Sequence, residues 1–397
     1  MTVQKSLLLS LSLAAACGGT PSSNPKGGGT TGMAVVHSDY KSTSVSLLDP
    51  ATGVITRDDC IDSGTMAPVL SLALSGDVAL PSQTQGGSLV LIDRTNAALV
   101  WVDPATCAVT RQLSVGTGFA ANPQDVVPVS ATKAYVSRYA LNTKPGVQPN
   151  DLGDDLLVIN PQAGTVTGRI DMGTYTTGAA VLARPSHALL ANGKVYVALN
   201  EISADFMTVG TGRVAIVDPS TDTAAGTIDL PALKDCDGLD YIDATKTLLV
   251  SCRGDISSMT PAATSGVAIF DVSGATPVLK KTISASALGG RTIGSVIGAV
   301  TDTTAVVSID GDFSGTPSDS LWTLNLSAGT GTKLADADGA FVLGGLAVDT
   351  ASNRVYVTSG SLTMPRVLVY DASALASESP TDTSTKTGLP PRLIAWY

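Results

Sequence analysis

Short apolar segments alternate with turn residues along the whole chain, and residues 184–230 show this pattern most fully. Segments rich in β-branched and small apolar residues predict strands, here Ser186–Leu190, Lys194–Leu199, Arg213–Val217 and Ala224–Leu230. Turn-forming residues separate them, such as Asn192-Gly193 and Asp218-Pro219-Ser220. Four such strands make an antiparallel meander, whose Val and Ile face must be covered by neighbouring copies.

The meander recurs along the chain at a regular interval. An apolar run that ends in Asp or Asn and is followed by a turn occurs at Asp49, Asp103, Asn160, Asp218, Asp271, Asn325 and Asp371. Successive markers lie 46 to 58 residues apart. Units of four strands, repeated roughly four to eight times, are typical of a β-propeller. The pattern therefore predicts an all-β fold of seven four-stranded antiparallel blades over residues 33–397.

Two segments carry a family resemblance, Val195-Tyr196-Val197-Ala198 and Val355-Tyr356-Val357-Thr358-Ser359. Each is followed, after a loop, by an apolar strand, an Asp and a short turn. In this the chain resembles the YVTN-type β-propeller repeats of bacterial surface and envelope proteins, which are loosely related to WD40 propellers. The resemblance covers residues 33–371, although the literal Tyr-Val-Thr-Asn string does not occur. It implies strand packing and the fold, and it does not identify a ligand.

The first blade lacks its innermost strand at the N-terminal end. Met33–Val36 matches the second strand of the unit, and Val45–Leu48 and Val54–Arg57 match the third and fourth. The last strand signal in the chain is Arg392–Tyr397. We therefore expect this segment to complete either blade seven or blade one and so to close the ring.

Composition and net charge exclude some classes of binding partner. Hydrophobic residues make up 44% of the chain and charged residues only 15%, with a net charge of −10. Nucleic acids and anionic lipid surfaces require basic patches, so neither is an expected partner. The ordinary role of such a negative charge is to keep an exported protein soluble.

The N-terminus predicts export. Residues 1–16 contain one Lys and an apolar run that begins at Leu7 and is too short to span a bilayer, which is typical of a signal peptide. The order Leu13-Ala14-Ala15-Ala16-Cys17 resembles the lipobox of bacterial lipoproteins, except that Ala14 stands where family members usually have Leu. The resemblance implies a lipid on Cys17, and the alternative is ordinary secretion with cleavage near Ala16.

The next residues, 17–32, are rich in Gly, Ser and Pro and predict a flexible tether before the folded body. Gly18 follows the lipidated Cys in place of Asp. By the same resemblance, this directs a Gram-negative lipoprotein to the outer membrane. The membrane is then contacted only through the N-terminal lipid.

Loop lengths differ between the two predicted faces of the disc. Turns between the first and second strands, and between the third and fourth, are tight. The long loops lie between the second and third strands and open on the opposite face. Long loops on one end of a rigid scaffold are where binding usually occurs. They span residues 139–154, 200–212, 253–266, 310–320 and 360–365.

Polar residues stand where the second strands end and where the innermost strands begin. Because both positions reach the long-loop face, we expect a binding face around the mouth of the central channel. For each residue taken alone, the alternative is a solvated loop charge. The candidates are Arg138, Asn200, Glu201, Arg253, Asp255, Asp310 and Asp312 at the loops, and Asp125, His187, Asp237 and Asp240 near the channel mouth.

Catalytic and metal motifs are scarce. His37 and His187 are the two histidines, so a multi-histidine metal site is excluded and a Ser-His-Asp triad would need one of them. No Gly-x-Ser-x-Gly, Walker-type or His-Glu-x-x-His motif occurs. Residues 310–315 match the opening of a calcium loop, but Leu321 stands where a bidentate Glu should be. This partial match makes Ca²⁺ the one cofactor that the sequence suggests.

Four cysteines remain when Cys17 is assigned to the lipid. Cys236 and Cys252 flank one predicted hairpin, so they should lie opposite each other and form a disulfide. Cys60 falls late in one outer strand and Cys107 opens the next. At about 3.3 Å per residue, this offset argues against a bond between them. An even count in an exported protein argues for the bond, so this pairing is left open.

Three functions fit these observations. The leading one is a non-enzymatic binding or scaffold module, tethered by its lipid, that presents the long-loop face to a protein or glycan. The second is a hydrolase resembling propeller lactonases, which often use a divalent metal, with Glu201, His187, Asp237 and Asp240 as candidate residues. The third is a structural surface-layer component. An enzyme needs carboxylates that converge within a few ångströms, whereas a binding protein needs a broad exposed face.

Overall fold

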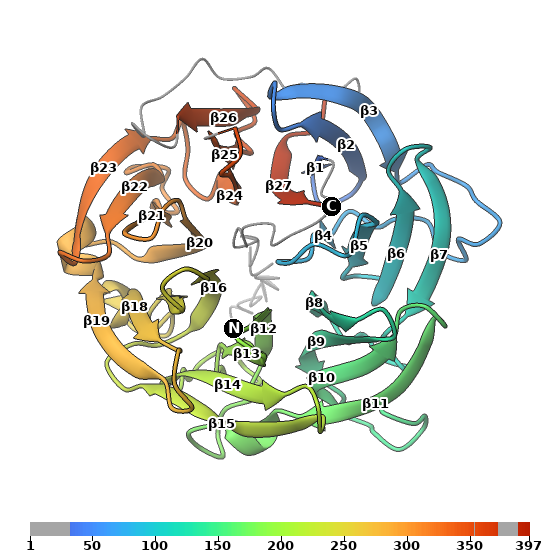
Figure 1. The fold of residues 1–397 in the computed structure, drawn as a ribbon, viewed down its shortest axis with the longest axis horizontal. Coiled ribbons are helices and arrows are strands. Elements are labelled where there is room, and N and C mark those ends of the chain that lie inside the picture. Colours follow the sequence, from blue (N-terminus) through green and yellow to red (C-terminus); the bar gives the residue numbers. More distant parts are fainter. Residues whose placement is uncertain (1–31, 353, 372–387) are drawn as a thin grey trace, which may run out of the picture.

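The computed structural model describes residues 32–352, 354–371 and 388–397, which form a ring of seven antiparallel sheets around a central axis (Figure 1). Each sheet is a blade, with its first strand nearest the axis and its last at the rim. Six blades have four strands, and the seventh has three among the described residues. The chain is therefore a seven-bladed β-propeller, as the repeat predicts. None of the helices in the described ranges could cross a membrane.

The first four blades follow one another in chain order. Blade one contains β27 (Pro391–Trp396), β1 (Met33–Ser38), β2 (Thr43–Asp49) and β3 (Val54–Asp62). Blade two contains β4 (Val78–Ala79), β5 (Leu89–Asp93), β6 (Ala98–Asp103) and β7 (Ala108–Ser114). Blade three contains β8 (Pro123–Ser130), β9 (Lys133–Leu141), β10 (Gly153–Asn160) and β11 (Thr165–Asp171). Blade four contains β12 (Pro185–Ala191), β13 (Lys194–Leu199), β14 (Gly212–Asp218) and β15 (Thr223–Leu230).

The remaining blades continue the ring. Blade five contains β16 (Cys236–Ile242), β17 (Thr247–Cys252), β18 (Gly266–Asp271) and β19 (Val278–Ser284). Blade six contains β20 (Ile293–Ala299), β21 (Thr304–Ile309), β22 (Ser320–Asn325) and β23 (Thr330–Asp336). Blade seven contains β24 (Leu343–Asp349), β25 (Arg354–Ser359) and β26 (Arg366–Asp371). Short 3-10 turns lie at η1 (Gly173–Tyr175), η2 (Pro261–Thr264) and η3 (Ala285–Leu288).

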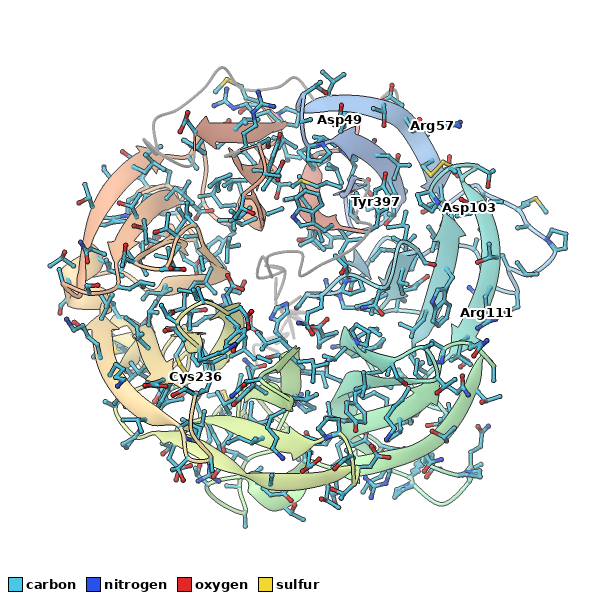
Figure 2. The ribbon with its side chains drawn as sticks, in the orientation of Figure 1. Asp49, Arg57, Asp103, Arg111, Cys236 and Tyr397 are labelled. Atoms are coloured by element: carbon cyan, nitrogen blue, oxygen red, sulfur yellow. A yellow bond between two sulfur atoms is a disulfide. The ribbon has the colours of Figure 1, made fainter. Side chains whose placement is uncertain are left out.

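The seven repeat markers all end the third strand of a blade, which confirms the predicted boundaries. In four of them, the side chain closes the turn to the fourth strand. Asp49, Asp103, Asp218 and Asp271 accept a hydrogen bond from the backbone N–H two residues later, at 2.8–2.9 Å. An Asx turn of this kind is a local structure, which is why the marker can be read from sequence. Figure 2 labels two of these residues, Asp49 and Asp103.

The C-terminal strand closes the ring through blade one. β27 pairs antiparallel with β1, and Met33 lies opposite Trp396 in this ladder. Of the two closures that the sequence allowed, the structure therefore shows the one in blade one. Because the innermost strand and its neighbour come from opposite ends of the chain, closure ties the two ends together.

The core lies between the blades. Met33 and Val35 of blade one, for example, pack with Ala347 and Tyr356 of blade seven. The hydroxyl of Tyr356, a residue of the family-like motif, donates to the carbonyl of Pro50 in the next blade at 2.5 Å. The motif tyrosine therefore joins adjacent blades, in agreement with its expected packing role.

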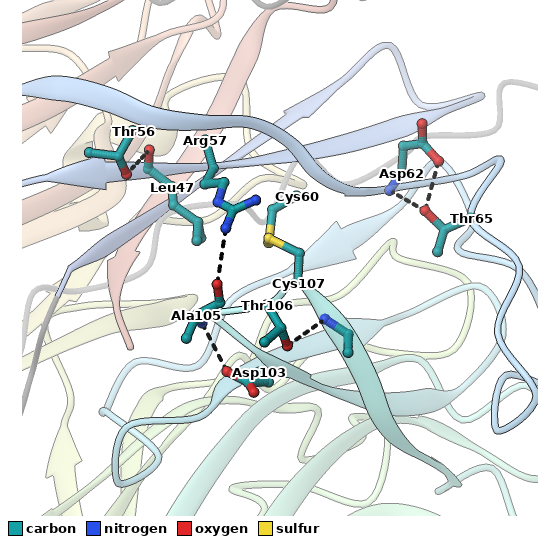
Figure 3. Close-up of a disulfide and its surroundings, with 11 residues drawn as sticks. Leu47, Thr56, Arg57, Cys60, Asp62, Thr65, Asp103, Ala105, Thr106 and Cys107 are labelled. Carbon is teal, nitrogen blue, oxygen red and sulfur yellow. Dashed lines mark hydrogen bonds between the residues drawn. A yellow bond between two sulfur atoms is a disulfide. The ribbon is translucent and has the colours of Figure 1, made fainter.

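Two disulfides are present among the described residues. Cys236 and Cys252 lie opposite each other in the β16–β17 ladder and are bonded, as predicted. Cys60 and Cys107 are also bonded, with Cα atoms 5.1 Å apart, so the predicted strand offset was wrong (Figure 3). The β2–β3 ladder shifts register twice, and Cys107 lies in the β6–β7 turn with φ 59°. Counting residues along regular strands therefore overestimated the separation.

The buried side chain of His37 on β1 makes the fold sensitive to acid. Burial lowers the pKa of this imidazole from 6.5 to about 4, against smaller opposing effects of the Leu389 backbone and Asp59. Between these values the unfolded chain takes up a proton that the folded chain does not. The free energy of unfolding should therefore fall by about 3 kcal/mol between pH 6.5 and pH 4, and be unaffected by this group above pH 6.5.

The variant His37→Leu should remove this loss. We expect the difference in unfolding free energy between variant and wild type, from urea titrations, to change by about 3 kcal/mol from pH 7 to pH 4. Taking the difference cancels Asp154, Asp235 and Asp310, whose pKa values burial raises to about 6, 7 and 6 and which act in the opposite sense. Parallel pH profiles for the two proteins would contradict the prediction.

Candidate functional site

The long loops lie on one face of the disc, as predicted, and we call it the long-loop face. They join the second and third strands of blades three to seven, over residues 142–152, 200–211, 253–265, 310–319 and 360–365. Within the described ranges, the other face carries short turns with one exception. Residues 80–88 separate β4 from β5 in blade two, so the expectation of a uniformly tight turn was wrong there. Gln83 of this segment exchanges two hydrogen bonds with the backbone of Leu190 in blade four.

The first described residues lie on the short-turn face. Met33 pairs with Leu48, next to the marker Asp49 that begins a short turn. Tyr397 donates from its backbone N–H to the carbonyl of Gly32 at 3.2 Å. Gly32 therefore lies on the face opposite the long loops.

Four of the long loops share a local structure that exposes an apolar side chain. In each, the side-chain oxygen of Asp or Ser accepts a hydrogen bond from the backbone N–H two residues later, at 2.8–3.2 Å, and the residue between is large and apolar. Because Asx and ST turns fix the backbone locally, they hold that residue outward. The turns are Asp205-Phe206-Met207, Asp255-Ile256-Ser257, Asp312-Phe313-Ser314 and Ser361-Leu362-Thr363.

Together with Val147 in the fifth loop, these residues form a set that we call the apolar tips. The backbone N–H of Val147 is likewise held by a carboxylate, that of Asp151, at 2.8 Å. The apolar tips therefore stand on five consecutive blades of one face. They are Val147, Phe206, Ile256, Phe313 and Leu362, with exposed fractions of 82%, 40%, 42%, 91% and 82% in that order. The same loops also expose Met207, Met259 and Met364.

A pocket of about 50 Å³, which we call the mouth pocket, opens near the axis on the same face. Blades one, two, five, six and seven contribute to its lining. Three arginines from three different blades line it, namely Arg94, Arg253 and Arg392. Two aromatic residues, Tyr40 and Phe341, belong to the same wall. The pocket thus combines cationic and aromatic groups that are far apart in sequence.

Two of the three arginines are paired with acids of the pocket. Nε of Arg94 donates to Asp77 Oδ1 at 2.8 Å. Arg253 Nη2 lies 3.6 Å from Asp310 Oδ2. In each of these two pairs the positive and negative charges nearly cancel. The net charge of the pocket lining therefore depends on the third arginine, Arg392.

Beside the mouth pocket, blades four and five hold His187 against Asp237. His187 Nδ1 lies 3.2 Å from Asp237 Oδ1, and both residues are buried. Burial alone would lower the pKa of His187, but Asp237 and, more weakly, Asp125 raise it above its ordinary value. Burial likewise opposes ionisation of Asp237, yet His187 lowers its pKa. Each of the two side chains therefore favours the charged form of the other.

Asp235 and Asp310 add two acids that titrate near neutral pH. Burial raises the pKa of Asp235 to about 7 and that of Asp310 to about 6, while Arg253 acts in the opposite direction on both. Nδ2 of Asn200 donates to Asp235 Oδ1 at 2.6 Å. The charge around the channel mouth therefore changes with pH in the physiological range.

The structure separates the sequence candidates into three groups. His187, Asn200, Asp237, Arg253 and Asp310 meet at or beside the channel mouth. Of the remaining candidates, Asp255 and Asp312 hold the loop turns that carry apolar tips.

The other four candidates bond within or between blades. Arg138 is fully buried and pairs with Asp155, so it is neither an exposed contact nor a solvated loop charge. Asp125 accepts hydrogen bonds from the backbone N–H of Ser82 and of Ala188, both at 2.9 Å. The remaining two also accept hydrogen bonds from backbone N–H groups, Asp240 from Tyr241 and Ala299, and Glu201 from Thr177.

Several residues of the mouth were missed from sequence. Arg392 is the second residue of the closing strand β27, and a closing innermost strand must begin at the channel mouth, so its position could have been inferred. Asp235 stands directly before Cys236, where the inner strand β16 begins, and a residue just before a predicted inner strand carries the same signal. Arg94, Tyr40 and Phe341 lie in connections of blades with no distinguishing pattern, and only the fold brings them together.

The described residues show no cluster of side chains that could bind a metal ion. Within residues 32–352, 354–371 and 388–397, no group of three or more His, Cys, Asp or Glu could hold a metal ion. In the partial calcium-loop match, Asp310 faces Arg253, and Asp312 accepts the N–H of Ser314 at 2.8 Å. Calcium binding stays a prediction from the motif alone.

Comparisons with known proteins agree on the fold. No family model and no curated protein matches the sequence. A candidate 6-phosphogluconolactonase from Bacteroides fragilis matches with a TM-score of 0.56 at 11% identity, over 92% of this chain and 97% of that one. A functionally unknown protein from Desulfotomaculum acetoxidans matches with 0.53 at 12%, over 92% and 99%. Hydrazine synthase from Kuenenia stuttgartiensis matches with 0.53 at 15%, over 72% and 74%. At these identities the likeness shows architecture and not activity, and what the chain shares with all three is the β-propeller.

Proposed function

We propose that this chain is a lipid-anchored protein of the cell envelope that binds a partner protein through its apolar tips. The observation that carries the proposal is the turn shared by four long loops, which holds a large apolar residue in solvent. Exposed apolar surface on a soluble fold marks interaction sites, and aromatic residues and Met are enriched in protein interfaces. Because the tips span five blades, they suit the broad contact that a protein partner makes.

Charge beside the apolar tips indicates the chemistry of the partner. Asp205 and Asp312 directly precede two of the tips, and hydrogen bonds from Ser203 and Ser314 respectively lower their pKa values, so both are ionised. The whole chain carries a net charge of −10. A complementary surface would present apolar residues with Lys or Arg around them. Tips such as Val147 and Leu362 offer no hydrogen-bonding side chain to a sugar, so we favour a protein over a glycan.

The anchor is proposed from the sequence, because Cys17 lies outside the described residues. Its position is compatible with the tips, since Gly32 is on the opposite face and a tether there would direct the tips away from the membrane. We propose attachment to the outer membrane through this lipid. The variant Cys17→Ser should move from the detergent phase to the aqueous phase in Triton X-114 partitioning, and unchanged partitioning would contradict the lipid.

Removing two apolar tips should abolish partner capture. We expect Phe313→Ser/Leu362→Ser to retain at least tenfold less of the partner from envelope extracts of the source organism than wild type does, because both side chains are more than four-fifths exposed and contribute contact rather than core packing. The measurement is quantitative mass spectrometry of crosslinked, affinity-purified material.

A matched control uses two apolar residues on the rim strand β19. Val278→Ser/Leu279→Ser removes side chains that are 53% and 52% exposed but distant from the long loops, and capture should be unchanged. Equal loss in both variants, or no protein captured by the wild type, would refute the proposal. Retention of envelope polysaccharide in place of protein would establish the glycan alternative.

A lactonase-like hydrolase is the second candidate, and one observation favours it. Asp237 Oδ2 is buried beside His187, and no described residue donates to it a hydrogen bond of ordinary geometry. Both oxygens of Asp240 accept backbone N–H groups, and Glu201 accepts one through Oε2 while its Oε1 is also buried without a hydrogen bond among the described residues. If the pair is catalytic, wild type should hydrolyse sugar lactones and His187→Ala should not. No hydrolysis across a panel of sugar and aliphatic lactones would eliminate this candidate.

A further inference from the structure

We propose that the mouth pocket binds a small organic carboxylate with an aromatic or apolar substituent, and that Arg392 holds its carboxylate group. This site adjoins the protein contact made by the apolar tips, because Phe341 of the pocket lies beside the tip Phe313, but it takes a different ligand through different residues. Three observations carry it: the unbalanced charge of Arg392, the aromatic residues around it, and the backbone conformation of those residues.

Arg392 is the cation that the pocket does not neutralise. Its Nε donates to the carbonyl of Ser38 at 3.0 Å, and its guanidinium lies 5.1 Å from the ring centre of Tyr40. No carboxylate of the described residues forms an ion pair with it, whereas Arg94 and Arg253 have Asp77 and Asp310. Three guanidinium groups and two carboxylates leave the pocket lining with one excess positive charge. A planar, positively charged guanidinium group can donate two parallel hydrogen bonds to the two oxygens of a carboxylate.

The aromatic residues of the pocket determine which substituent the carboxylate ligand can carry. Tyr40 and Phe341 both line the pocket, and the ring of Phe341 lies 4.6 Å from that of the exposed Phe313. The pocket, of about 50 Å³, accommodates a carboxylate group and is open to solvent on one side. The remainder of a ligand must therefore extend outward between these rings, where an aromatic or apolar substituent is favoured.

Both aromatic residues adopt a left-handed backbone. Tyr40 has φ 66° and Phe341 has φ 56°, a region that bulky residues rarely occupy and that costs free energy. Side chains hold them there: Ser38 Oγ accepts the N–H of Tyr40 at 2.8 Å, and Asp319 Oδ1 accepts the N–H of Phe341 at 2.8 Å. Such maintained strain is typical of ligand-binding positions. The two rings are thus placed by the fold before any ligand arrives.

The test uses benzoate, acetate and the uncharged analogue benzamide, with binding measured by isothermal titration calorimetry and by chemical shifts of the probe. Wild type should bind benzoate more tightly than acetate and should not bind benzamide detectably. The variant Arg392→Gln should weaken benzoate at least tenfold, and Arg392→Lys should bind it with intermediate affinity because the charge remains and the fork is lost.

The matched control is Arg57→Gln, which removes an arginine from the same blade. Arg57 lies on β3 at the rim of the disc and donates to the carbonyl of Ala105 at 3.1 Å (Figures 2 and 3). Its benzoate affinity should equal that of wild type. Equal losses in the two variants would show that only overall charge matters, and equal affinity for benzoate and benzamide would show that no carboxylate is recognised. Either result overturns the proposal.

Arg392 also contributes to the packing of the closing strand, so its replacement can affect folding as well as binding. A second variant that leaves Arg392 in place separates the two effects. Tyr40 is 50% exposed, and Asn tolerates its left-handed backbone. Tyr40→Asn should therefore fold with an unchanged melting temperature, lose at least fivefold in benzoate affinity and keep its affinity for acetate. Unchanged benzoate affinity in this variant would refute the aromatic part of the site, and with it the proposed ligand class.

Discussion

Replacing Asp319 by alanine should lower the free energy of unfolding by about 5 kcal/mol. Asp319 stands directly before β22 and is only 2% exposed. Its carboxylate accepts four backbone N–H groups, from Gly311 at 2.7 Å, Phe341 at 2.8 Å, Val342 at 2.7 Å and Leu343 at 3.0 Å. Each buried donor left without a partner costs roughly 1–3 kcal/mol. Together these bonds join blade six to the start of blade seven.

The same device joins blades three and four, where Asp154 accepts the N–H groups of Ala183 and Arg184 at 3.0 and 2.6 Å. For Asp319, the measurement is urea unfolding followed by circular dichroism. Asp319→Asn should lose less than the alanine variant because one acceptor oxygen remains. The control Asp312→Ala, at an exposed turn of the same loop, should cost less than about 1 kcal/mol. A similar small loss for Asp319→Ala would contradict the joining role.

The blade boundaries could be read from sequence because their cause is local. In the marker Asp218, the side-chain oxygen and the N–H of Ser220 that it binds are two residues apart. The alternation of apolar and polar residues in each strand is also a local feature. It indicates which side chains are buried against a neighbouring blade. A repeat of local features fixes the number of blades without any knowledge of how they meet.

The mouth pocket could not be predicted in this way. Arg94 comes from blade two and Arg392 from the last strand of the chain, and no spacing in the sequence relates them. Their meeting depends on closure of the ring and on the number of blades between them. The Cys60–Cys107 bond escaped prediction for a related reason, since two register shifts in the β2–β3 ladder alter the length that residue counting assumes.

Polar residues at the loops were the least predictable. Arg138 and Asp125 lie toward the long-loop face, whereas Asp240 lies opposite Leu249, closer to the short-turn end of β16. The sequence placed all three at strand ends near the long-loop face. It could not show that their side chains turn inward to bond strands of the same or neighbouring blades. A polar residue at a strand end carries the same signal whether it binds a ligand or joins two blades, and burial distinguishes the two.

The variant Arg138→Met should cost about 4 kcal/mol of unfolding free energy because it leaves a buried carboxylate without its main partner. Both side chains of the Arg138–Asp155 pair have no exposed surface, and two hydrogen bonds of 2.7 Å join them. Arg138 also donates to Thr117 Oγ1 and to the carbonyl of Asn150, each at 2.7 Å. Arg169 remains 3.3 Å from Asp155 and compensates only in part, since it is itself a quarter exposed.

The double variant Arg138→Met/Asp155→Leu should recover most of that loss, because a buried ion pair is often no more stabilising than apolar side chains of similar volume. Urea unfolding of the two single variants and the double variant gives the coupling energy. The exposed pair Lys333–Asp336 is the control, and its coupling should be under about 0.5 kcal/mol. If Arg138 instead served as a ligand contact, the single variant would keep its stability and lose binding, and the double variant would show no recovery. Arg138 therefore stabilises the fold, although the sequence alone predicts that it contacts a binding partner.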